Sequence, residues 1–502
     1  MPTFPSCKSP RYGPRFPQID VPEKDAAKAG SRKERPPEGR VNLQQVTGVQ
    51  DELSKGSNME LTRRQFLGKT TTAVLVAGTM ATGKVFGANN RIQMCTIGFH
   101  GQGGSHIKDI LGMKDDAEYV ALCDVDSEVL DRGAKTVETA QGKVPKKYRD
   151  IRQALEDKEI DAVTIATPNH WHSLAAVWAC QAGKDVYVEK PLSHSIYEGR
   201  QLVAAAEKYG RMVQHGTQSR SNAGLIRDMK LIHDGFIGTI VESRGWVYKN
   251  GNRGPIGHGK PGPVPDNLDW TLWQGPSPDH EYMINVDRKK PGLYVHYDWH
   301  YFWEYGNGEI GNQGVHQMDA ACWGHNRGLP VKVYSSGGRY GLNDDGQTPN
   351  TQATTFTYAD GSIMTFEVRN LGSYEEFDGG NCGNSFFGTK GFYVLGKGFF
   401  SYKEGKMSER EAKSIPTDTP TPEKGNKWVR FFNAVRSRKT SDLSVSTLDA
   451  HRSCVHCHLG NIAYRVGRSL DFDPQTERFK DDEANKYVKR QYRNGFEVSQ
   501  LT

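Results

Sequence analysis

Residues 94–106 read MCTIGFHGQGGSH, a strand-like apolar run that leads directly into a glycine-rich turn. The turn holds Gly101, Gln102, Gly103 and Gly104. Such a turn between a strand and a helix lets backbone amides approach a pyrophosphate at the helix N-terminus. With the motif read from Gly101, His106 stands in place of the usual third glycine. The stretch therefore predicts a dinucleotide site whose loop is imperfect.

An acidic residue downstream strengthens this prediction. Asp124 follows the apolar run 118–123 and lies 23 residues after Gly101. A carboxylate at the end of the second strand accepts the hydroxyls of the adenosine ribose and repels a 2′-phosphate. We therefore predict NAD as the cofactor, with NADP less favoured.

Strand-like and helix-like stretches alternate between residues 91 and 215. The strand-like runs are short and apolar, and they cover residues 94–99, 118–123, 162–166, 186–189 and 212–215. The helix-like stretches cover residues 127–142, 151–157, 172–183 and 195–209. Alternation of this kind is typical of α/β proteins with a doubly wound parallel sheet. We predict a Rossmann domain over residues 91–215.

The pattern changes from residue 216 onward. Long loops rich in Gly, Pro and Asn separate amphipathic strand-like runs at residues 239–248, 331–336, 352–358, 362–367, 386–387 and 392–395. Helical stretches follow at residues 427–438 and 447–466. We predict that residues 216–502 form an α+β domain with a large, mostly antiparallel open sheet.

The N-terminal region has the character of an export leader. TRRQFL at residues 62–67 precedes an apolar run that is too short to span a bilayer, and small residues at positions 87–88 fit a cleavage site. We predict a twin-arginine signal over residues 59–88, and with it the export machinery as partner, a periplasmic or otherwise exported location, and no stable membrane span after cleavage. Residues 1–58 read as a disordered extension, either translated or the product of a misassigned start upstream of Met59.

The net positive charge of the chain belongs to this leader. Residues 1–90 hold 14 Lys and Arg against 8 Asp and Glu, whereas the remainder holds 51 of each. A balanced charge outside the leader gives no electrostatic basis for a polyanion partner. We therefore predict no nucleic-acid partner.

Two further motifs resemble the family of glucose–fructose oxidoreductase, inositol dehydrogenase and MocA. They are ATPNHWH at residues 166–172 and VYVEKPL at residues 186–192, and LDWTLWQGP at residues 268–276 adds to the likeness. The resemblance implies that Lys190 contacts cofactor and substrate hydroxyl, that Pro191 follows a cis bond, and that the protein assembles as a dimer or tetramer. It also implies cofactor contacts from Thr167, Asn169, His172, Glu189 and Gln218.

On the substrate side, residues 306–319 read GNGEIGNQGVHQMD. Members of the family usually place an aspartate four residues before a histidine, so that both face one side of a helix. Here His316 fits, but Asn312 occupies the aspartate position, and an amide cannot accept a proton. The resemblance therefore implies His316 as base, assisted by Lys190, with Asn312 orienting the substrate. Asp319 is predicted to orient His316, to bind substrate or to cap locally.

An aromatic segment lies just before this motif. Residues 294–303 read YVHYDWHYFW, and its Tyr297, Trp299 and His300 are predicted to contact substrate, because aromatic faces with nearby polar groups suit sugar rings. His296 and His300 could also bind a metal, but no complete ligand set is visible, so we predict none. A buried aromatic core is the alternative reading.

The CVHCH stretch at residues 454–458 matches the attachment pattern of c-type haem. It lies inside a helix-like segment, which argues against haem.

These features predict an exported, NAD(P)-dependent oxidoreductase that acts on a hydroxyl of a sugar, cyclitol or glycoside and retains its NAD tightly. A glycoside hydrolase or epimerase that uses transient oxidation is the first alternative. A carbohydrate-binding protein without catalysis is the second.

Overall fold

The computed structural model describes residues 91–249, 254–372, 381–403, 406–422 and 426–502. The predicted extension 1–58 and export signal 59–88 lie outside the described residues.

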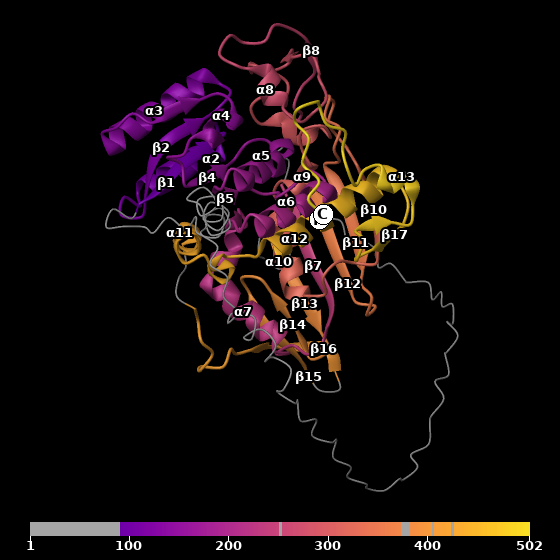
Figure 1. Cartoon of the computed structure of the whole chain (residues 1–502). Helices are drawn as coiled ribbons and strands as arrows, with labels where there is room; N and C mark the ends of the chain where they lie inside the picture. The colour runs from indigo at the N-terminus through magenta and orange to yellow at the C-terminus, as the bar shows by residue number, and fades with distance from the viewer. Residues whose placement is uncertain (1–90, 250–253, 373–380, 404–405, 423–425) are drawn as a thin grey trace, which may run out of the picture. The chain divides into compact units, whose positions relative to one another are not determined.

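Six parallel strands form the N-terminal sheet in the order β3-β2-β1-β4-β5-β6. They are β1 (Ile92–Ile97), β2 (Ala117–Cys123), β3 (Lys146–Tyr148), β4 (Ala162–Ile165), β5 (Asp185–Val188) and β6 (Val213–His215). The helices between them are α2 (Gln102–Leu111), α3 (Ser127–Gln141), α4 (Ile151–Glu156), α5 (Asn169–Gln181) and α6 (Ile196–Lys208). Because the chain leaves β1 toward both edges in turn, the sheet is doubly wound, and the predicted Rossmann class is confirmed (Figure 1).

Local sequence explains where these helices begin and end. Asp126 caps α3 by accepting hydrogen bonds from the backbone amides of Glu128 and Val129, and Gly142 ends it at a φ of 72°. Ser195 caps α6 in the same way. Strand β3 was not predicted because its three residues are short of any apolar pattern.

A ten-stranded sheet in the order β16-β15-β14-β13-β7-β12-β11-β10-β17-β18 dominates the C-terminal half. Its strands are β7 (Ile240–Tyr248), β10 (Lys332–Gly338), β11 (Thr351–Thr357), β12 (Ile363–Arg369), β13 (Cys382–Gly388), β14 (Gly391–Val394), β15 (Gly398–Lys403), β16 (Lys406–Lys413), β17 (Leu470–Asp473) and β18 (Arg478–Phe479). Neighbours are antiparallel except β7 and β12. The predicted large, mostly antiparallel sheet is confirmed, although β15 to β18 were not foreseen.

Helices cover one face of this sheet. They include α7 (Ala223–His233), α10 (Gly314–His325) and α12 (Thr447–Val466). The short helix η1 (Gln218–Ser221) packs on α7 and α10, η4 (Thr440–Asp442) packs on the helix at residues 427–437, and α13 (Asp482–Asn485) packs on α12 and β18. Helix α10 packs on β7 and β13, and α12 packs on β10. Burial alternates along β10 and β11, so the opposite side chains of these strands face solvent.

A long excursion between β7 and α10, which we call the bridging segment (residues 254–313), reaches back to the Rossmann domain. It holds β8 (Gly259–Pro261), α8 (Trp270–Gln274), β9 (Met283–Asn285), η2 (Asp298–Tyr301) and α9 (Gly308–Gly311). The amide of Ser127 donates to the carbonyl of Asn267, and the amide of Asp269 donates to the carbonyl of Val125. The segment is thereby attached to the N-terminal end of α3.

Helix α11 (Lys427–Ser437) also crosses between the two halves. Its Trp428, Phe431 and Phe432 belong to the same apolar cluster as Ile92 and Tyr187 of the Rossmann sheet. The predicted boundary at residues 215 and 216 therefore divides the chain by sequence, whereas the N-terminal core includes a helix from far downstream.

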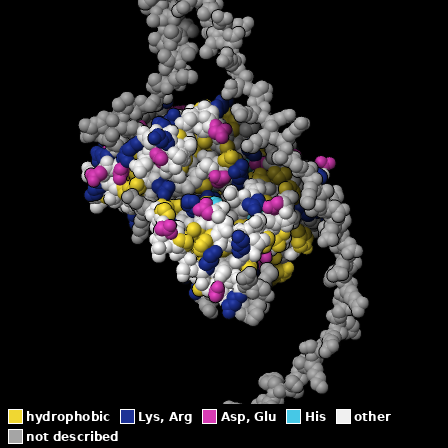
Figure 2. Space-filling model, turned by 90° about the horizontal axis from the view of Figure 1, so that it is seen from below, with side chains coloured by type: hydrophobic (Ala, Val, Ile, Leu, Met, Phe, Trp, Pro, Cys, Tyr) yellow, Lys and Arg dark blue, Asp and Glu magenta, His cyan; other side chains and the backbone are white. Residues whose placement is uncertain are grey.

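The visible surface in Figure 2 mixes Lys and Arg with Asp and Glu rather than gathering one sign. Among the described residues, no helix is both long and apolar enough to cross a membrane.

Candidate active site

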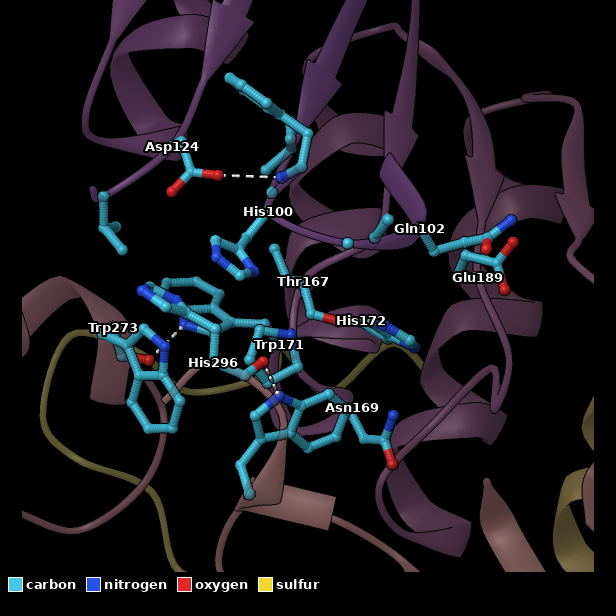
Figure 3. A pocket seen from close by; sticks show the side chains of 18 of the residues that line it. His100, Gln102, Asp124, Thr167, Asn169, Trp171, His172, Glu189, Trp273 and His296 are labelled. Carbon is cyan, nitrogen blue, oxygen red and sulfur yellow. Dashed lines mark hydrogen bonds between the residues drawn. The ribbon is translucent and has the colours of Figure 1, made fainter. Parts of the chain in front are cut away.

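A cavity of about 430 Å³ lies between the carboxyl ends of the Rossmann strands, the bridging segment and α10. Open α/β sheets bind ligands at this edge. Thirteen of the predicted site residues line it: Gly101, Gln102, Asp124, Thr167, Asn169, His172, Glu189, Lys190, Tyr297, Trp299, His300, Asn312 and His316. Figure 3 labels Gln102, Asp124, Thr167, Asn169, His172 and Glu189 among them. Gly103, Gly104, Gln218 and Asp319 lie outside the lining.

The glycine loop begins three residues earlier than the sequence suggested. Gly98 has a φ of 74°, and a Cβ there would stand 2.8 Å from a Thr167 methyl group. A Cβ on Gly103 would collide with the Gly98 carbonyl oxygen, as expected for the glycine that brings helix and strand together. The fingerprint therefore runs from Gly98 to Gly103 with His100 in the middle position. The reading from Gly101, with His106 as the replaced glycine, was wrong.

His106 instead belongs to the support of Glu189. The ring is fully buried, and its Nε2 donates a hydrogen bond of 3.1 Å to Glu189. Burial by itself would raise the pKa of Glu189, but the bond from His106 and the charge of Lys190 hold that pKa at about 2. Gln218 reaches the same carboxylate at 3.4 Å, so it supports Glu189 and does not face the cavity.

The loop and Asp124 fit a dinucleotide. Helix α2 has no side-chain cap and no acidic residue in its first turn, which leaves its N-terminal amides for an anion. The Asp124 carboxylate accepts bonds of 2.8 Å from the Phe99 amide and 3.0 Å from the Asp126 amide. Burial raises the pKa of Asp124 to about 6 against these bonds, so the group is largely ionised at neutral pH.

Two buried oxygens in the lining have no hydrogen-bond partner among the described residues. They are the hydroxyl of Thr167 and the side-chain carbonyl of Asn169. Buried polar atoms are normally satisfied, so these two point to a ligand with polar groups. NAD is the cofactor that this donor and acceptor set fits.

His172 holds two parts of the site together. Its ring nitrogens lie 2.6 Å from the Pro191 carbonyl oxygen and 2.8 Å from the Thr167 carbonyl oxygen. The Lys190–Pro191 peptide bond is cis, as the resemblance implied. His172 therefore fixes the backbone on both sides of the cavity floor.

Lys190 and Asn312 meet across the cavity. The Lys190 ammonium donates to both the carbonyl and the side-chain oxygen of Asn312, each at 3.2 Å. The Asn312 amide in turn donates to the Tyr297 hydroxyl at 3.3 Å. Asn312, in the usual aspartate position, thus still accepts a hydrogen bond from Lys190, but its amide cannot act as a base.

His316 lies in the first turn of α10, whereas Asn312 precedes that helix, at the end of α9, with a non-helical ψ of −89°. The helical spacing expected between Asn312 and His316 is therefore interrupted. In the described part of the chain the His316 ring has no hydrogen-bond partner, so both nitrogens are available to a ligand. Burial, followed by the charge of Lys190, lowers the pKa of His316 to about 4. The imidazole is therefore neutral at pH 7 and able to accept a proton.

Asp319 is placed away from the cavity, contrary to its prediction as a substrate contact. Both carboxylate oxygens are taken by the Arg220 guanidinium at 2.8 and 2.9 Å, and Ser453 donates a further bond of 2.8 Å. Asp319 stands three residues after His316 on α10, about one turn further along the helix, where it is buried against Arg220 of η1 and Ser453 of α12. It fixes the helix that presents His316.

The aromatic segment forms one wall of the cavity. The His300 ring stacks on Trp299 with centroids 3.6 Å apart, and its Nδ1 lies 2.6 Å from the Tyr297 carbonyl. Trp171 and Trp273 also line the cavity and were missed as site residues, although both lie inside quoted motifs. His100 and Gln313 were missed as well, and His296 was considered only as a metal ligand.

The CVHCH stretch is part of the core. Cys454 and Cys457 are fully buried in α12, where the Cys454 thiol accepts from the Leu192 amide and the Cys457 thiol donates to the Ile310 carbonyl. Neither sulfur can reach a haem. The described residues contain no group of three or more His, Cys, Asp or Glu that could hold a metal ion.

Two family models match the chain. One is described as the oxidoreductase family, NAD-binding Rossmann fold, over residues 92–217, and the other as the oxidoreductase family, C-terminal alpha/beta domain, over residues 226–498.

Curated relatives match only in part. A glycosyl hydrolase family 109 protein from Shewanella pealeana is 30% identical over 173 residues, covering 33% of this chain and 37% of the relative. An inositol 2-dehydrogenase from Salmonella typhimurium is 30% identical over 147 residues, covering 29% of this chain and 43% of the relative. The chain thus spans less than half the length of these relatives.

Solved structures match over most of their length. The WlbA dehydrogenase from Bordetella pertussis, in complex with NADH and UDP-GlcNAcA, has a TM-score of 0.54 at 19% identity. The match covers 76% of this chain and 99% of the WlbA chain. GenD2 from gentamicin A biosynthesis, in complex with NAD, has a TM-score of 0.51 at 20% identity, and the match covers 76% of this chain and 97% of the GenD2 chain. At these identities the likeness concerns the fold.

Proposed function

The chain belongs to the family of glucose–fructose oxidoreductase, inositol dehydrogenase and MocA (Gfo/Idh/MocA), whose members are NAD-binding oxidoreductases. We propose that it oxidises a secondary alcohol of a sugar, cyclitol or glycoside, or reduces the corresponding ketone. The observation that carries this proposal is the meeting of Lys190, Asn312 and His316 in the cavity that the glycine loop enters. A cation that stabilises charge on the hydroxyl oxygen and a neutral imidazole that accepts its proton suit the oxidation of an alcohol by NAD.

NAD, when bound, supplies the hydride acceptor or donor. His316 takes the hydroxyl proton in the oxidative direction and returns it in the reductive one. Lys190 stabilises negative charge on the same oxygen as the proton leaves. Asn312 positions Lys190 and offers its amide to a substrate hydroxyl. General-base catalysis of this kind contributes about 100- to 10,000-fold in rate.

The substrate class rests on the aromatic wall. Trp299, His300 and Tyr297 present flat apolar surface next to polar atoms, which suits the two-sided surface of a sugar ring. The names of the inositol dehydrogenase and of the structure with a nucleotide sugar agree with a polyol or sugar substrate.

A second candidate is a glycosidase that oxidises its substrate transiently. The similarity to the glycosyl hydrolase family 109 protein favours it. In that reaction a hydride leaves the sugar, the neighbouring C–H becomes acidic, the glycosidic bond breaks by elimination, water adds, and the hydride returns. The third candidate is carbohydrate binding without catalysis.

One experiment separates the three. The purified protein, loaded with NAD, is given a panel of sugars, cyclitols and aryl glycosides while nicotinamide absorbance and aglycone release are followed together. Net absorbance change without release supports the oxidoreductase. Release with no net absorbance change supports the glycosidase. Binding with neither signal, for every compound, contradicts both enzymatic proposals.

Export belongs to the proposal as well. NAD is not free outside the cytoplasm, so an exported enzyme has to carry its cofactor and regenerate it within turnover or with a second substrate. Cell fractionation of the intact chain beside an Arg63→Lys, Arg64→Lys variant tests this, with periplasmic protein expected only for the parent chain. Light scattering tests the predicted dimer or tetramer.

A further inference from the structure

The middle position of the dinucleotide fingerprint is normally glycine, because the backbone has to approach the pyrophosphate there. In this chain that position holds His100, which lines the cavity. Its neighbour Gly101 keeps open space, with no atom within 4 Å of where a Cβ would stand. The large side chain of His100 therefore stands at the point of the loop that a bound pyrophosphate would approach.

His100 does not stand alone. Its ring is stacked on that of His296, with centroids 4.1 Å apart and planes at 15° (Figure 3). His296 comes from the bridging segment, more than 190 positions later in the chain, and its Nε2 lies 3.2 Å from the carboxylate of Asp126. Asp126 is the cap of α3 and also accepts from Asn267 at 2.9 Å. Loop, bridging segment and α3 are thus connected across the cofactor half of the cavity.

We propose that His100 and His296 form a clasp that retains the dinucleotide: the His100 ring donates an N–H to the pyrophosphate, and His296 holds that ring closed over it. This inference rests on NAD as the cofactor and adds a retention device built from two segments that are distant in the sequence.

Three observations support the clasp. The Nε2 atom of His296 pairs with the Asp126 carboxylate, so the ring is held by a residue of the Rossmann domain although its backbone belongs to the bridging segment. His100 has no hydrogen-bond partner among the described residues, which leaves its nitrogens for a ligand. Burial lowers the pKa of both rings, that of His296 to about 4, so two neutral rings stack without repulsion near pH 7. Release of NAD then requires the stack to separate.

The test measures how fast NAD leaves. Protein loaded with a fluorescent NAD analogue is mixed with excess NAD, and the loss of bound fluorescence gives the dissociation rate. His100→Gly, which restores the usual fingerprint, is expected to release NAD about tenfold faster, as is His296→Ala, since one charge-assisted hydrogen bond is worth about 1.4 kcal/mol or more. The double variant is expected to resemble either single variant, because both remove one device.

His258→Ala is the matched control, because His258 lies in the same bridging segment, pairs with Asp287 and stays outside the cavity. Its release rate is expected to equal that of the parent protein. Melting temperatures without NAD verify that the variants fold. Unchanged or slower release from His100→Gly overturns the clasp while leaving the proposed function intact. A parent protein that binds no dinucleotide overturns both.

Discussion

The two walls of the cavity are built in different ways. The cofactor wall consists of residues at the ends of parallel strands, such as Gly98, Asp124 and Lys190. The substrate wall consists of the bridging segment and the start of α10, where side chains from Tyr297 to His316 are held by aromatic packing and buried polar pairs. A regular sheet positions the first wall, whereas the second depends on contacts between distant segments. Substitutions should therefore act differently on the two walls.

The largest effect is expected on the substrate wall, at His316. His316→Ala removes the proton acceptor, so kcat/KM should fall by about 100- to 10,000-fold. NAD binding, measured by fluorescence titration, should be unchanged, because the cofactor wall is untouched. His258→Ala serves as control. Full turnover by His316→Ala would contradict the assignment of the base.

Asp319 tests whether the substrate wall depends on its distant supports. Asp319→Ala leaves the buried Arg220 without its partner, which should cost about 3–5 kcal/mol in the free energy of unfolding. Urea denaturation measures that cost. The double variant with Arg220→Ala should lose less than the sum of the two single variants. Additive losses of stability would show that Arg220 and Asp319 are not coupled, and would contradict the role of this pair in fixing α10.

Gly103 and Gly101 provide a matched pair on the cofactor wall. A methyl group at Gly103 collides with the Gly98 carbonyl, so Gly103→Ala should destabilise the protein by about 1–3 kcal/mol and weaken NAD binding. Gly101→Ala meets open space and should cost less. Thermal unfolding and NAD titration of both variants compare them. Equal losses of stability and NAD affinity in the two variants would contradict the fingerprint that runs from Gly98 to Gly103.

The smallest effect concerns pH. His316 has to be neutral to accept a proton, and its lowered pKa of about 4 keeps it so through the neutral range. The kcat/KM of NAD-loaded protein should therefore fall only at acid pH, reaching half its plateau near pH 4. A half-point near 6.5, the ordinary value for histidine, would show that burial and Lys190 do not act on this ring.

Several features of the site were accessible from sequence. Asp124 was predicted from its place at the end of a recognisable strand, and Lys190 and His316 were predicted from motifs that resemble the family. Thirteen predicted residues line the cavity. The ten-stranded sheet was foreseen in kind, but β15 to β18 were not, since their residues lack a long apolar alternation.

Other features depended on pairings that no local pattern records. His106 was taken for a broken glycine position, yet it pairs with Glu189, 83 residues away. Asp319 was predicted to orient His316, to bind substrate or to cap locally, yet its carboxylate is bound by the guanidinium of Arg220, 99 residues away. The aromatic residues of α11 joined the N-terminal core from more than 300 positions downstream of β1.

The sequence by itself determined the parallel Rossmann sheet and the preference for NAD, because both follow from the order of residues within a strand, turn or helix. The roles of Lys190 and His316 are implied by the family resemblance and stay predictions. Only the tertiary structure decided that the fingerprint begins at Gly98, that Asn312 still receives Lys190, and that His100 meets His296. The physical reason is that local geometry depends on neighbours along the chain, whereas hydrogen bonds, charge and burial in the site depend on neighbours in space.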